Sequence, residues 1–376
     1  MLRFIKFEIL TTMNQFANYP LTNRARHLLK SQLGNVFEYN QCEDEIIDLR
    51  TFDSAFFRSL SSLPTLSLSA FGEYSGVQGI PALLSHISQM IGVANNGIQI
   101  TSGASEGLHL VMQVLVELGT VVALPYPTFP AYWRLVEFCG GTCVNYHDVD
   151  DLLALFTQTE GAPNLVVVGW PENPTGRVID LKKIEEILSK SNRHSTVLIL
   201  DLTYPLTDLM DSNTREVLSR LEDRLVMVGS IGKLLFLPGL RLGFVATNLS
   251  NIFRAICELK RHSSFEPCYL SQNLALQLWS DKDYMASITK RMELLMHRHS
   301  LFRNAISEVG VCCKVIPNAR GFYEFVEDSS ILVNLGLIGV PGNIFSDQRE
   351  AMRYCLAVGE NRWENTLNRL TNHKII

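Results

Sequence analysis

Leu165-Val-Val-Val-Gly-Trp-Pro-Glu-Asn-Pro-Thr-Gly176 joins a continuous apolar run to a polar turn that is rich in proline. A strand that is buried on both faces of a parallel sheet needs such a run, so residues 165–169 are predicted to form one. Similar runs alternate with stretches of helical apolar spacing, such as 105–118 and 181–189, which is typical of a mostly parallel sheet with helices on both faces. The predicted strands are 97–101, 120–124, 142–146, 165–169, 196–200, 224–229 and 242–246.

The pattern changes beyond about residue 269, where a long amphipathic stretch from 281 to 309 precedes several short apolar runs. We expect short strands at Cys313–Ile316, Gly321–Phe325, Ser330–Asn334 and Arg353–Ala357, and a helix over Thr22–Leu33 that packs on them. The sequence therefore predicts an α/β fold with two domains. A large domain spans residues 50–268, and a smaller α+β domain combines residues 1–49 with 269–376.

The composition excludes several classes of function. The 33 Lys and Arg residues against 38 Asp and Glu leave a net charge of −5, which disfavours binding to nucleic acid. Eight cysteines without a CxxC pair and nine histidines without an HExxH motif predict reduced thiols and no metal site. We find neither a signal-peptide core near the start nor an apolar stretch of 18 residues. We therefore expect a cytoplasmic protein that does not enter a membrane.

Unusual residues follow the predicted strands, at the edge where open α/β sheets bind ligands. Thr101-Ser-Gly-Ala-Ser-Glu106 leads into a helix, where Gly103 permits close backbone approach and the free amides can hold a phosphate. A helix capping box is the alternative interpretation of this segment. Pro125-Tyr-Pro-Thr-Phe-Pro-Ala-Tyr132 places aromatic rings at the same edge, although a rigid turn with core aromatics fits equally well.

Three further junctions carry polar or charged residues. Asn173 stands between a proline-set backbone and a glycine, which aims its amide into the crevice. Asp201 directly follows four apolar residues, where a carboxylate is costly unless it meets a positive partner or strong donors. Lys233 precedes an apolar run, an environment that lowers the pKa of an ammonium group and frees the amine for Schiff-base chemistry. Arg241 follows eight residues later.

These motifs resemble, in content and order, the fold-type-I pyridoxal-phosphate enzymes, and specifically the class I/II aminotransferases. The matching segments are Asn173-Pro-Thr-Gly176, Asp201-x-x-Tyr204 and Ser230-x-x-Lys233. The segments Phe236–Phe244 and Arg353–Asn365 look most like the histidinol-phosphate aminotransferase and threonine-phosphate decarboxylase branch. The resemblance implies that the large domain binds pyridoxal 5'-phosphate.

The resemblance also implies a role for each matching residue. Lys233 holds the cofactor as an internal aldimine and moves the substrate proton, while Asp201 pairs with the pyridine nitrogen. Asn173 and Tyr204 bind the phenolic oxygen, and Asn173 also lies against the substrate. Arg353 clamps the substrate carboxylate in a bidentate fork. Phe129 stacks on the cofactor ring. The implied phosphate-binding residues are Gly103, Ala104, Ser105, Ser230 and Arg241, together with Tyr74 from the second subunit of a homodimer.

We therefore expect an aminotransferase of amino acid metabolism that moves an amino group between an amino acid, or a related amine, and a 2-oxo acid. A decarboxylase or other lyase with the same cofactor is the alternative, and a non-catalytic regulator is a third possibility. Three departures from the family pattern surround the ring position: Gly232 before the lysine, Leu202 after Asp201, and Trp170-Pro-Glu172 in place of Asn-Pro-Asn. The motifs alone do not separate transamination from decarboxylation.

Overall fold

A large sheet of seven strands organises the computed structural model, which describes residues 46–53, 56, 74–157, 162–190, 196–204, 211–310, 319–346 and 350–372. The strand order is β2-β8-β7-β6-β5-β3-β4. All neighbouring pairs are parallel except those that β8 makes with β2 and β7. One strand therefore runs against the other six, and the predicted mostly parallel seven-stranded sheet is confirmed.

Each predicted strand is present, with ends that differ from the prediction by two residues or fewer. The observed strands are β2 (Ile98–Thr101), β3 (Val121–Pro125), β4 (Thr142–Tyr146), β5 (Leu165–Gly169), β6 (Val197–Leu202), β7 (Leu225–Gly229) and β8 (Gly243–Thr247). Four of them, β2, β5, β7 and β8, are buried at every residue, and β3 and β6 are buried at all but the first. This burial explains why the strands read as continuous apolar runs and not as alternating patterns.

Alternate strand residues pack against two different helix layers, because successive side chains of a strand point to opposite faces. Val166 and Val168 belong to the apolar cluster that includes helices α4, α8 and α9. Leu165 and Val167 belong to the cluster that includes α5, α6 and α11. The sheet is thus covered on both faces, and its ligand-binding edge lies at the carboxyl ends of its parallel strands.

Local sequence signals set the ends of two of these helices. α4 (Pro81–Ile91) and α6 (Pro130–Cys139) begin with proline and end before a left-handed glycine, Gly92 and Gly140. The remaining helices of this part are α5 (Gly103–Leu115), α7 (Val149–Thr157), α8 (Leu181–Lys190), α9 (Ser212–Arg220), α10 (Ile231–Leu234) and α11 (Ser250–Ser263), with short 3₁₀ turns η3 (Asn95–Gly97) and η5 (Pro238–Leu240).

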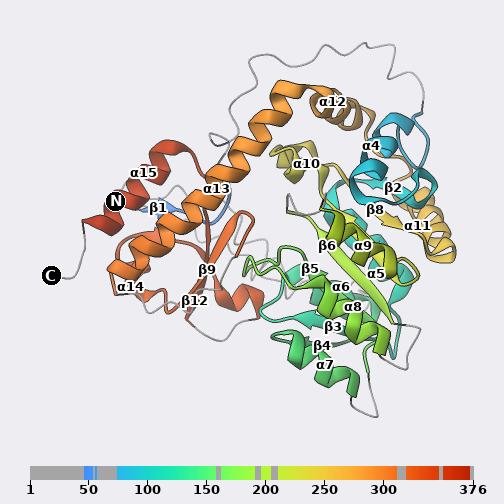
Figure 1. Cartoon of the computed structure of the whole chain (residues 1–376), viewed down its shortest axis with the longest axis horizontal. Helices are drawn as coiled ribbons and strands as arrows, with labels where there is room; N and C mark the ends of the chain where they lie inside the picture. The colour runs from blue at the N-terminus through green and yellow to red at the C-terminus, as the bar shows by residue number, and fades with distance from the viewer. Residues whose placement is uncertain are drawn as a thin grey trace, which may run out of the picture.

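The carboxyl-terminal part is built on one long helix, α13 (Lys282–Glu308), which follows α12 (Tyr269–Ser280). Figure 1 shows α13 running from α12, beside the large sheet, towards α14 and α15 at the other end of the molecule. A small antiparallel sheet has the order β11-β12-β9, and β1 pairs in parallel with β10. The elements are β1 (Ile47–Asp48), β9 (Tyr323–Glu327), α14 (Ser330–Asn334), β10 (Leu337–Ile338), β11 (Val340–Pro341), η6 (Gly342–Phe345), β12 (Ala351–Cys355) and α15 (Glu360–Thr371).

The strand predicted at Ser330–Asn334 is wrong, because these residues form the short helix α14. Its β-branched Ile331 and Val333 favour a strand, but a run of five residues is too short for its apolar spacing to separate helix from strand. Only Leu332 of the run is buried. The strands around 321–325 and 353–357 are present as β9 and β12.

Some predictions stay untested. Thr22–Leu33 and Cys313–Ile316 lie outside the described residues. The predicted domain boundary between residues 268 and 269 also stays a prediction. A contact crosses it, because Gln272 of α12 accepts a hydrogen bond from the amide of Ile80 (2.8 Å), which directly precedes α4. Within the described ranges, no helix is long and apolar enough to cross a membrane.

Candidate active site

A pocket opens at the carboxyl edge of the large sheet and collects most of the residues predicted to bind the cofactor. Lys233 comes from α10, directly after β7, and Asp201 is the penultimate residue of β6. Asn173 lies in the turn after β5, and Phe129 directly precedes α6. The lining residues are Ala104, Ser105, Leu108, Phe129, Tyr132, Pro171, Asn173, Asp201, Thr203, Tyr204, Ser230, Lys233 and Arg241. Because parallel strands end at one edge, these distant residues meet there.

A chain of hydrogen bonds links four polar side chains of the site. Lys233 Nζ lies 3.2 Å from the hydroxyl of Tyr204, which also accepts from Asn173 Nδ2 at 3.0 Å. The opposite end of the Asn173 amide, Oδ1, accepts from Arg353 Nη1 at 3.0 Å. Asn173, Tyr204 and Arg353 are buried. The predicted amine, amide, phenol and guanidinium therefore form one continuous network, which joins the large sheet to β12.

Asp201 is buried beside this network and accepts hydrogen bonds from two donors. Tyr132 donates its hydroxyl proton to Oδ2 (2.6 Å), and the amide of Thr203 donates to Oδ1 (2.8 Å). Burial raises the pKa of Asp201, and the two donors and the charge of Lys233 lower it in part. The carboxylate thus stands where a further positive partner stabilises its charged form. Tyr132 ends the aromatic segment 125–132, and no local pattern in the sequence links it to Asp201.

The electrostatic surroundings of Lys233 favour a free amine. Burial lowers the pKa of Lys233 from 10.5 to about 8. The charge of Asp201 raises that pKa in part, whereas the guanidinium groups of Arg353 and Arg241 lower it further. An amine that titrates near 8 is available as a nucleophile close to neutral pH, as Schiff-base chemistry requires. The lowered pKa predicted from the apolar neighbours of Lys233 is therefore confirmed.

An anion cradle lies at the start of α5. Gly103 has a φ of +77°, and a Cβ atom placed on it would stand 2.9 Å from Arg241 Nη2. The absence of that Cβ lets the guanidinium approach the first turn of the helix, where backbone amides are free to donate. Ser105, Ser230 and Arg241 line the pocket at this end. A positive group, hydroxyls and helix amides together suit a phosphate.

Arg353 is held between aromatic rings. Its Cζ lies 3.9 Å from the centre of the Tyr323 ring and 5.0 Å from that of Phe345. Nη2 donates to the carbonyl of Arg50 (3.1 Å), while Nε is buried without a hydrogen-bond partner among the described residues. The guanidinium thus keeps unused donors in a buried place, which fits the bidentate recognition of a carboxylate.

A buried ion pair shapes the turn that carries Asn173. Glu172 receives two hydrogen bonds from the guanidinium of Arg177, at 2.8 and 3.0 Å, and one from Thr175 Oγ1 at 3.0 Å. The amide of Gly176 also donates to the carbonyl of Glu172 (2.8 Å). Glu172 belongs to one of the three departures from the family pattern, Trp170-Pro-Glu172. Its carboxylate is bound by the local partner Arg177, and it does not line the pocket.

Tyr74 alone among the predicted site residues lies far out on the surface. It is 80% exposed, and its ring stands edge-on to Phe265, itself 44% exposed, with centroids 5.3 Å apart. It does not line the pocket. Within the described part of a single chain, Tyr74 therefore does not reach the phosphate-binding residues with which the resemblance groups it.

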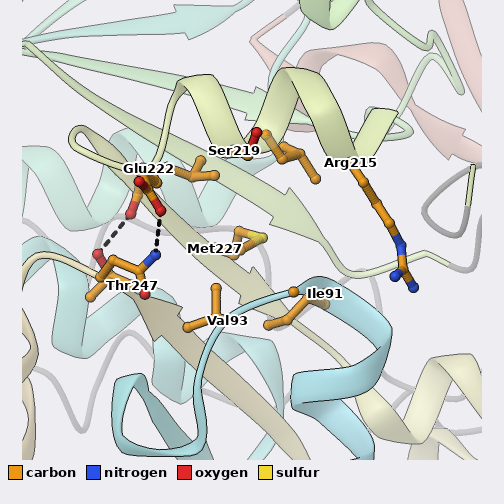
Figure 2. A pocket seen from close by; sticks show the side chains of 11 residues that line it. Ile91, Val93, Arg215, Ser219, Glu222, Met227 and Thr247 are labelled. Carbon is orange, nitrogen blue, oxygen red and sulfur yellow. Dashed lines mark hydrogen bonds between the residues drawn. The ribbon is translucent and has the colours of Figure 1, made fainter. Parts of the chain in front are cut away.

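A second hollow, of about 210 Å³, lies at the opposite edge of the large sheet, between α4 and α9 (Figure 2). Its charged rim groups are bonded within the protein: Asn248 donates to Glu222 (3.1 Å), and Arg215 donates to the carbonyl of Gln89 (3.0 Å). The floor is apolar, with Ile91, Val93, Leu218, Leu225 and Met227. None of the predicted site residues lines this hollow. The predicted site residues therefore point to the pocket at the carboxyl edge and not to this hollow.

The pocket at the carboxyl edge fits pyridoxal phosphate at each of its chemical groups. The amine of Lys233 suits the aldehyde, buried Asp201 suits a protonated ring nitrogen, and the cradle at Gly103 suits the phosphate. Among the described residues, no group of three or more His, Cys, Asp or Glu side chains could hold a metal ion. The fold and the site together define a fold-type-I pyridoxal-phosphate enzyme.

Comparison with known proteins extends this assignment. The family model "Aminotransferase class I and II" matches residues 54–370. YugH of Bacillus subtilis, an aminotransferase by provisional name, is 26% identical over 302 residues, which cover 76% of this chain and 77% of YugH. The histidinol-phosphate aminotransferase of Thermoanaerobacter pseudethanolicus is 29% identical, over 52% of this chain and 55% of that protein. A tetra-mutant aspartate aminotransferase of Thermus thermophilus in complex with tryptophan superposes with a TM-score of 0.74 at 20% identity, covering 94% of this chain and all of that one.

The chain belongs to the class I and II aminotransferases. It is a pyridoxal-phosphate-dependent aminotransferase, whose substrates are amino acids and 2-oxo acids. The predicted family, fold, cofactor and enzyme class are thereby confirmed. The roles of the individual site residues stay predictions.

Proposed function

We propose that this aminotransferase performs both half-reactions at the pocket formed by Lys233, Asp201, Tyr204, Asn173 and Arg353. The observation that carries the proposal is the unbroken hydrogen-bonded chain from Lys233 through Tyr204 and Asn173 to Arg353. It places a proton-accepting amine and a carboxylate-binding guanidinium at two ends of one network. An amino acid presents its α-carbon and its carboxylate to such a pair in a single orientation.

Bound pyridoxal phosphate supplies an aldehyde for the substrate amine and an aromatic ring that accepts electrons from the α-carbon. Lys233 is the residue that removes the α-proton and returns it, because its pKa of about 8 leaves a far larger share of the amine neutral near neutral pH than an ordinary lysine keeps. Asp201 keeps the ring nitrogen positive, and Tyr132 and Thr203 orient its carboxylate. Asn173 and Tyr204 donate hydrogen bonds to the phenolic oxygen.

Three further groups bind and orient. Arg353 binds the α-carboxylate of either substrate in the buried position between Tyr323 and Phe345. Phe129 lines the pocket and would stack on the cofactor ring. Gly103, Ala104, Ser105, Ser230 and Arg241 would hold the phosphate.

Visible absorption of the purified holoprotein tests the proposed reaction. Single amino acids are added to the wild-type protein, and conversion of the pyridoxal to the pyridoxamine spectrum is followed. We expect at least one amino acid to cause this conversion, and a 2-oxo acid to reverse it. Release of CO₂ without a pyridoxamine form identifies a decarboxylase instead, and binding without any spectral turnover identifies a regulator.

The pKa of Lys233 predicts how capture of the cofactor depends on pH. Below about pH 8 the amine is protonated and cannot attack an aldehyde, and above it the amine is neutral. We expect the rate of reductive trapping of pyridoxal phosphate by apoprotein to rise with pH and level off above about 8. A rise that continues to the ordinary lysine value of 10.5 contradicts the assignment. Peptide mapping of the trapped product identifies the labelled lysine.

We also propose that the protein is a cytoplasmic homodimer in which Tyr74 reaches the phosphate of the partner subunit. The exposure of Tyr74 in a single chain supports the shared site, and the thiols of Cys143, Cys257, Cys268 and Cys355 support the cytoplasmic location. Fractionation of cells that express the protein tests its location.

Subunit mixing tests the shared site. Lys233→Ala and Tyr74→Ala chains are each expected to be impaired. A heterodimer of the two has one site with both side chains intact, so refolding a mixture restores activity towards a quarter of the wild-type level. Absence of restoration shows that Tyr74 does not act across a dimer. Sedimentation of the wild-type protein reports the assembly state independently.

A further inference from the structure

Helix α13 and strand β9 enclose a buried charged cluster that none of the roles above uses. His299 Nδ1 lies 2.7 Å from Glu324 Oε1, and His299 Nε2 lies 3.0 Å from the carbonyl oxygen of Gly321. Arg303 Nε donates to the same oxygen of Glu324. The side chains of His299 and Glu324 are 2% and 3% exposed, and that of Arg303 is 22% exposed. A buried cluster of this kind is costly unless every charge has a partner.

Both ring nitrogens of His299 face hydrogen-bond acceptors. The carbonyl of Gly321 can only accept, so Nε2 must donate to it. Nδ1 lies within hydrogen-bond distance of Glu324, which also accepts a hydrogen bond from the guanidinium of Arg303. The ring of His299 therefore bridges a carboxylate and a backbone carbonyl.

The carbonyl that His299 holds belongs to a residue packed against the candidate site. Gly321 has a φ of +88°, and a Cβ atom placed on it would stand 3.2 Å from Pro171 Cγ and 3.6 Å from Tyr204 Cβ. Both Pro171 and Tyr204 line the pocket. Only a glycine combines this backbone conformation with so close an approach. His299 thus anchors the main chain at the point where it touches the wall of the pocket.

The residues around Gly321 carry further contacts to the site. The amide of Arg320 donates to the carbonyl of Gly176 (2.7 Å), which ends the turn that carries Asn173. The ring of Phe322 stands edge-on to Tyr204, with centroids 5.5 Å apart, and the ring of Tyr323 covers Arg353 at 3.9 Å. We name residues 319–324 the wall segment. Its position sets the position of Tyr204 and Arg353 from one side.

We infer that His299 is a positioning residue of this enzyme: its ring, bonded at both nitrogens, ties the wall segment to helix α13 and so keeps Tyr323 over Arg353 and Gly321 against Tyr204. The inference rests on the proposed role of Arg353 in binding the substrate carboxylate. Replacement of the ring removes the donor that faces the carbonyl of Gly321 and leaves Glu324 with the guanidinium of Arg303, and the wall segment shifts to satisfy the buried carbonyl.

Two readouts test the inference in the holoenzyme. The first is NMR of protein labelled with ¹⁵N-histidine, with the His299 signals assigned by their loss in His299→Gln. We expect Nε2 to carry a proton, because the carbonyl of Gly321 that it faces can only accept a hydrogen bond. A spectrum with a bare Nε2 overturns the bridging role. This measurement needs no substrate and no folded variant beyond the one used for assignment.

The second readout separates KM from kcat with the amino acid that converts the wild-type spectrum fastest. We expect His299→Gln and Glu324→Gln to raise KM about tenfold, with a smaller change in kcat, because the wall segment carries the contact to Arg353. His297→Gln is the matched control, since His297 lies on the same helix but is exposed. Unchanged KM in both His299→Gln and Glu324→Gln overturns the inference. A rise in KM that disappears when the assay is run well below the melting temperature of these variants overturns it too, because it then reflects unfolding.

Failure of the proposed function gives a different result. If wild-type holoprotein converts no amino acid, the roles of Lys233 and Arg353 are wrong, while the NMR result still decides whether His299 bridges Gly321 and Glu324. If the wild-type protein turns over and the His299 variants behave like His297→Gln, only the positioning role is wrong.

Discussion

Lys233→Ala is expected to lower kcat/KM by at least about a thousandfold, the largest effect of any single substitution in the chain. The variant loses both the amine that captures the aldehyde and the group that moves the substrate proton. Its cofactor remains bound only through the phosphate cradle and the ring contacts, so gel filtration removes it more easily. Steady-state kinetics and the visible spectrum after desalting measure the two effects.

The control for this substitution is Lys290→Ala, because Lys290 is exposed on α13 and far along the chain from the pocket. We expect its activity and spectrum to match the wild-type protein. Full turnover in Lys233→Ala, or borohydride labelling of another lysine in the wild-type protein, excludes Lys233 as the cofactor-binding residue. Addition of a small primary amine to Lys233→Ala restores part of the proton transfer if the assigned role is correct.

Asp201→Asn is expected to lower kcat/KM by about a hundredfold to a thousandfold while the protein stays folded and binds the cofactor. The amide keeps the shape of the side chain but cannot hold a positive charge on the ring nitrogen, so the ring withdraws electrons less strongly. The donors Tyr132 and Thr203 use different oxygens of Asp201, so the single amide oxygen of the Asn side chain keeps only one of these two hydrogen bonds. The rate of α-proton exchange in deuterated water reports the defect directly.

The stability of the apoprotein separates this chemical defect from misfolding. Burial raises the pKa of Asp201 in the folded state, so stability falls as pH rises from its unfolded value, 3.8, through the folded value, and stays lower above it. Removing the buried charge relieves this cost, while the lost acceptor for one donor opposes the gain, so we expect only a small change in the melting temperature of the apoprotein at pH 7. Asp223→Asn, at an exposed turn, is the matched control. A large loss of stability in Asp201→Asn assigns the residue a structural role instead.

Most of the candidate site could be predicted because its residues directly follow strands. Asn173 and Lys233 follow strands β5 and β7, and Asp201 is the penultimate residue of β6, which lies between those two strands in the sheet. Continuous apolar runs marked all three strands in the sequence. Once the strands are known to be parallel, their carboxyl ends must meet, and so must the residues that follow them. The strand assignments alone therefore predict that these residues lie together in one pocket.

The missed features depend on contacts between segments far apart in the chain. Tyr132 meets Asp201 across 69 positions, and no local pattern marks that pairing. Ser330–Asn334 forms a helix although its residues favour a strand, since the tertiary surroundings outweigh the weak preference of five residues. His299 looks in the sequence like any polar residue of a helix. Its buried partners, Glu324 and Gly321, become visible only in the folded chain.

The amino-acid sequence alone determined the seven-stranded sheet and the residues at the strand ends, because burial and backbone geometry act through neighbours in the chain. The cofactor class followed from the resemblance of the motifs to a known family. The tertiary structure alone decided the contacts that tune the site residues: it brings Tyr132 to Asp201, places the rings of Tyr323 and Phe345 around Arg353, and sets the charges around Lys233 that leave its pKa at about 8. Electrostatic and packing energies depend on distances through space, which a linear pattern does not contain.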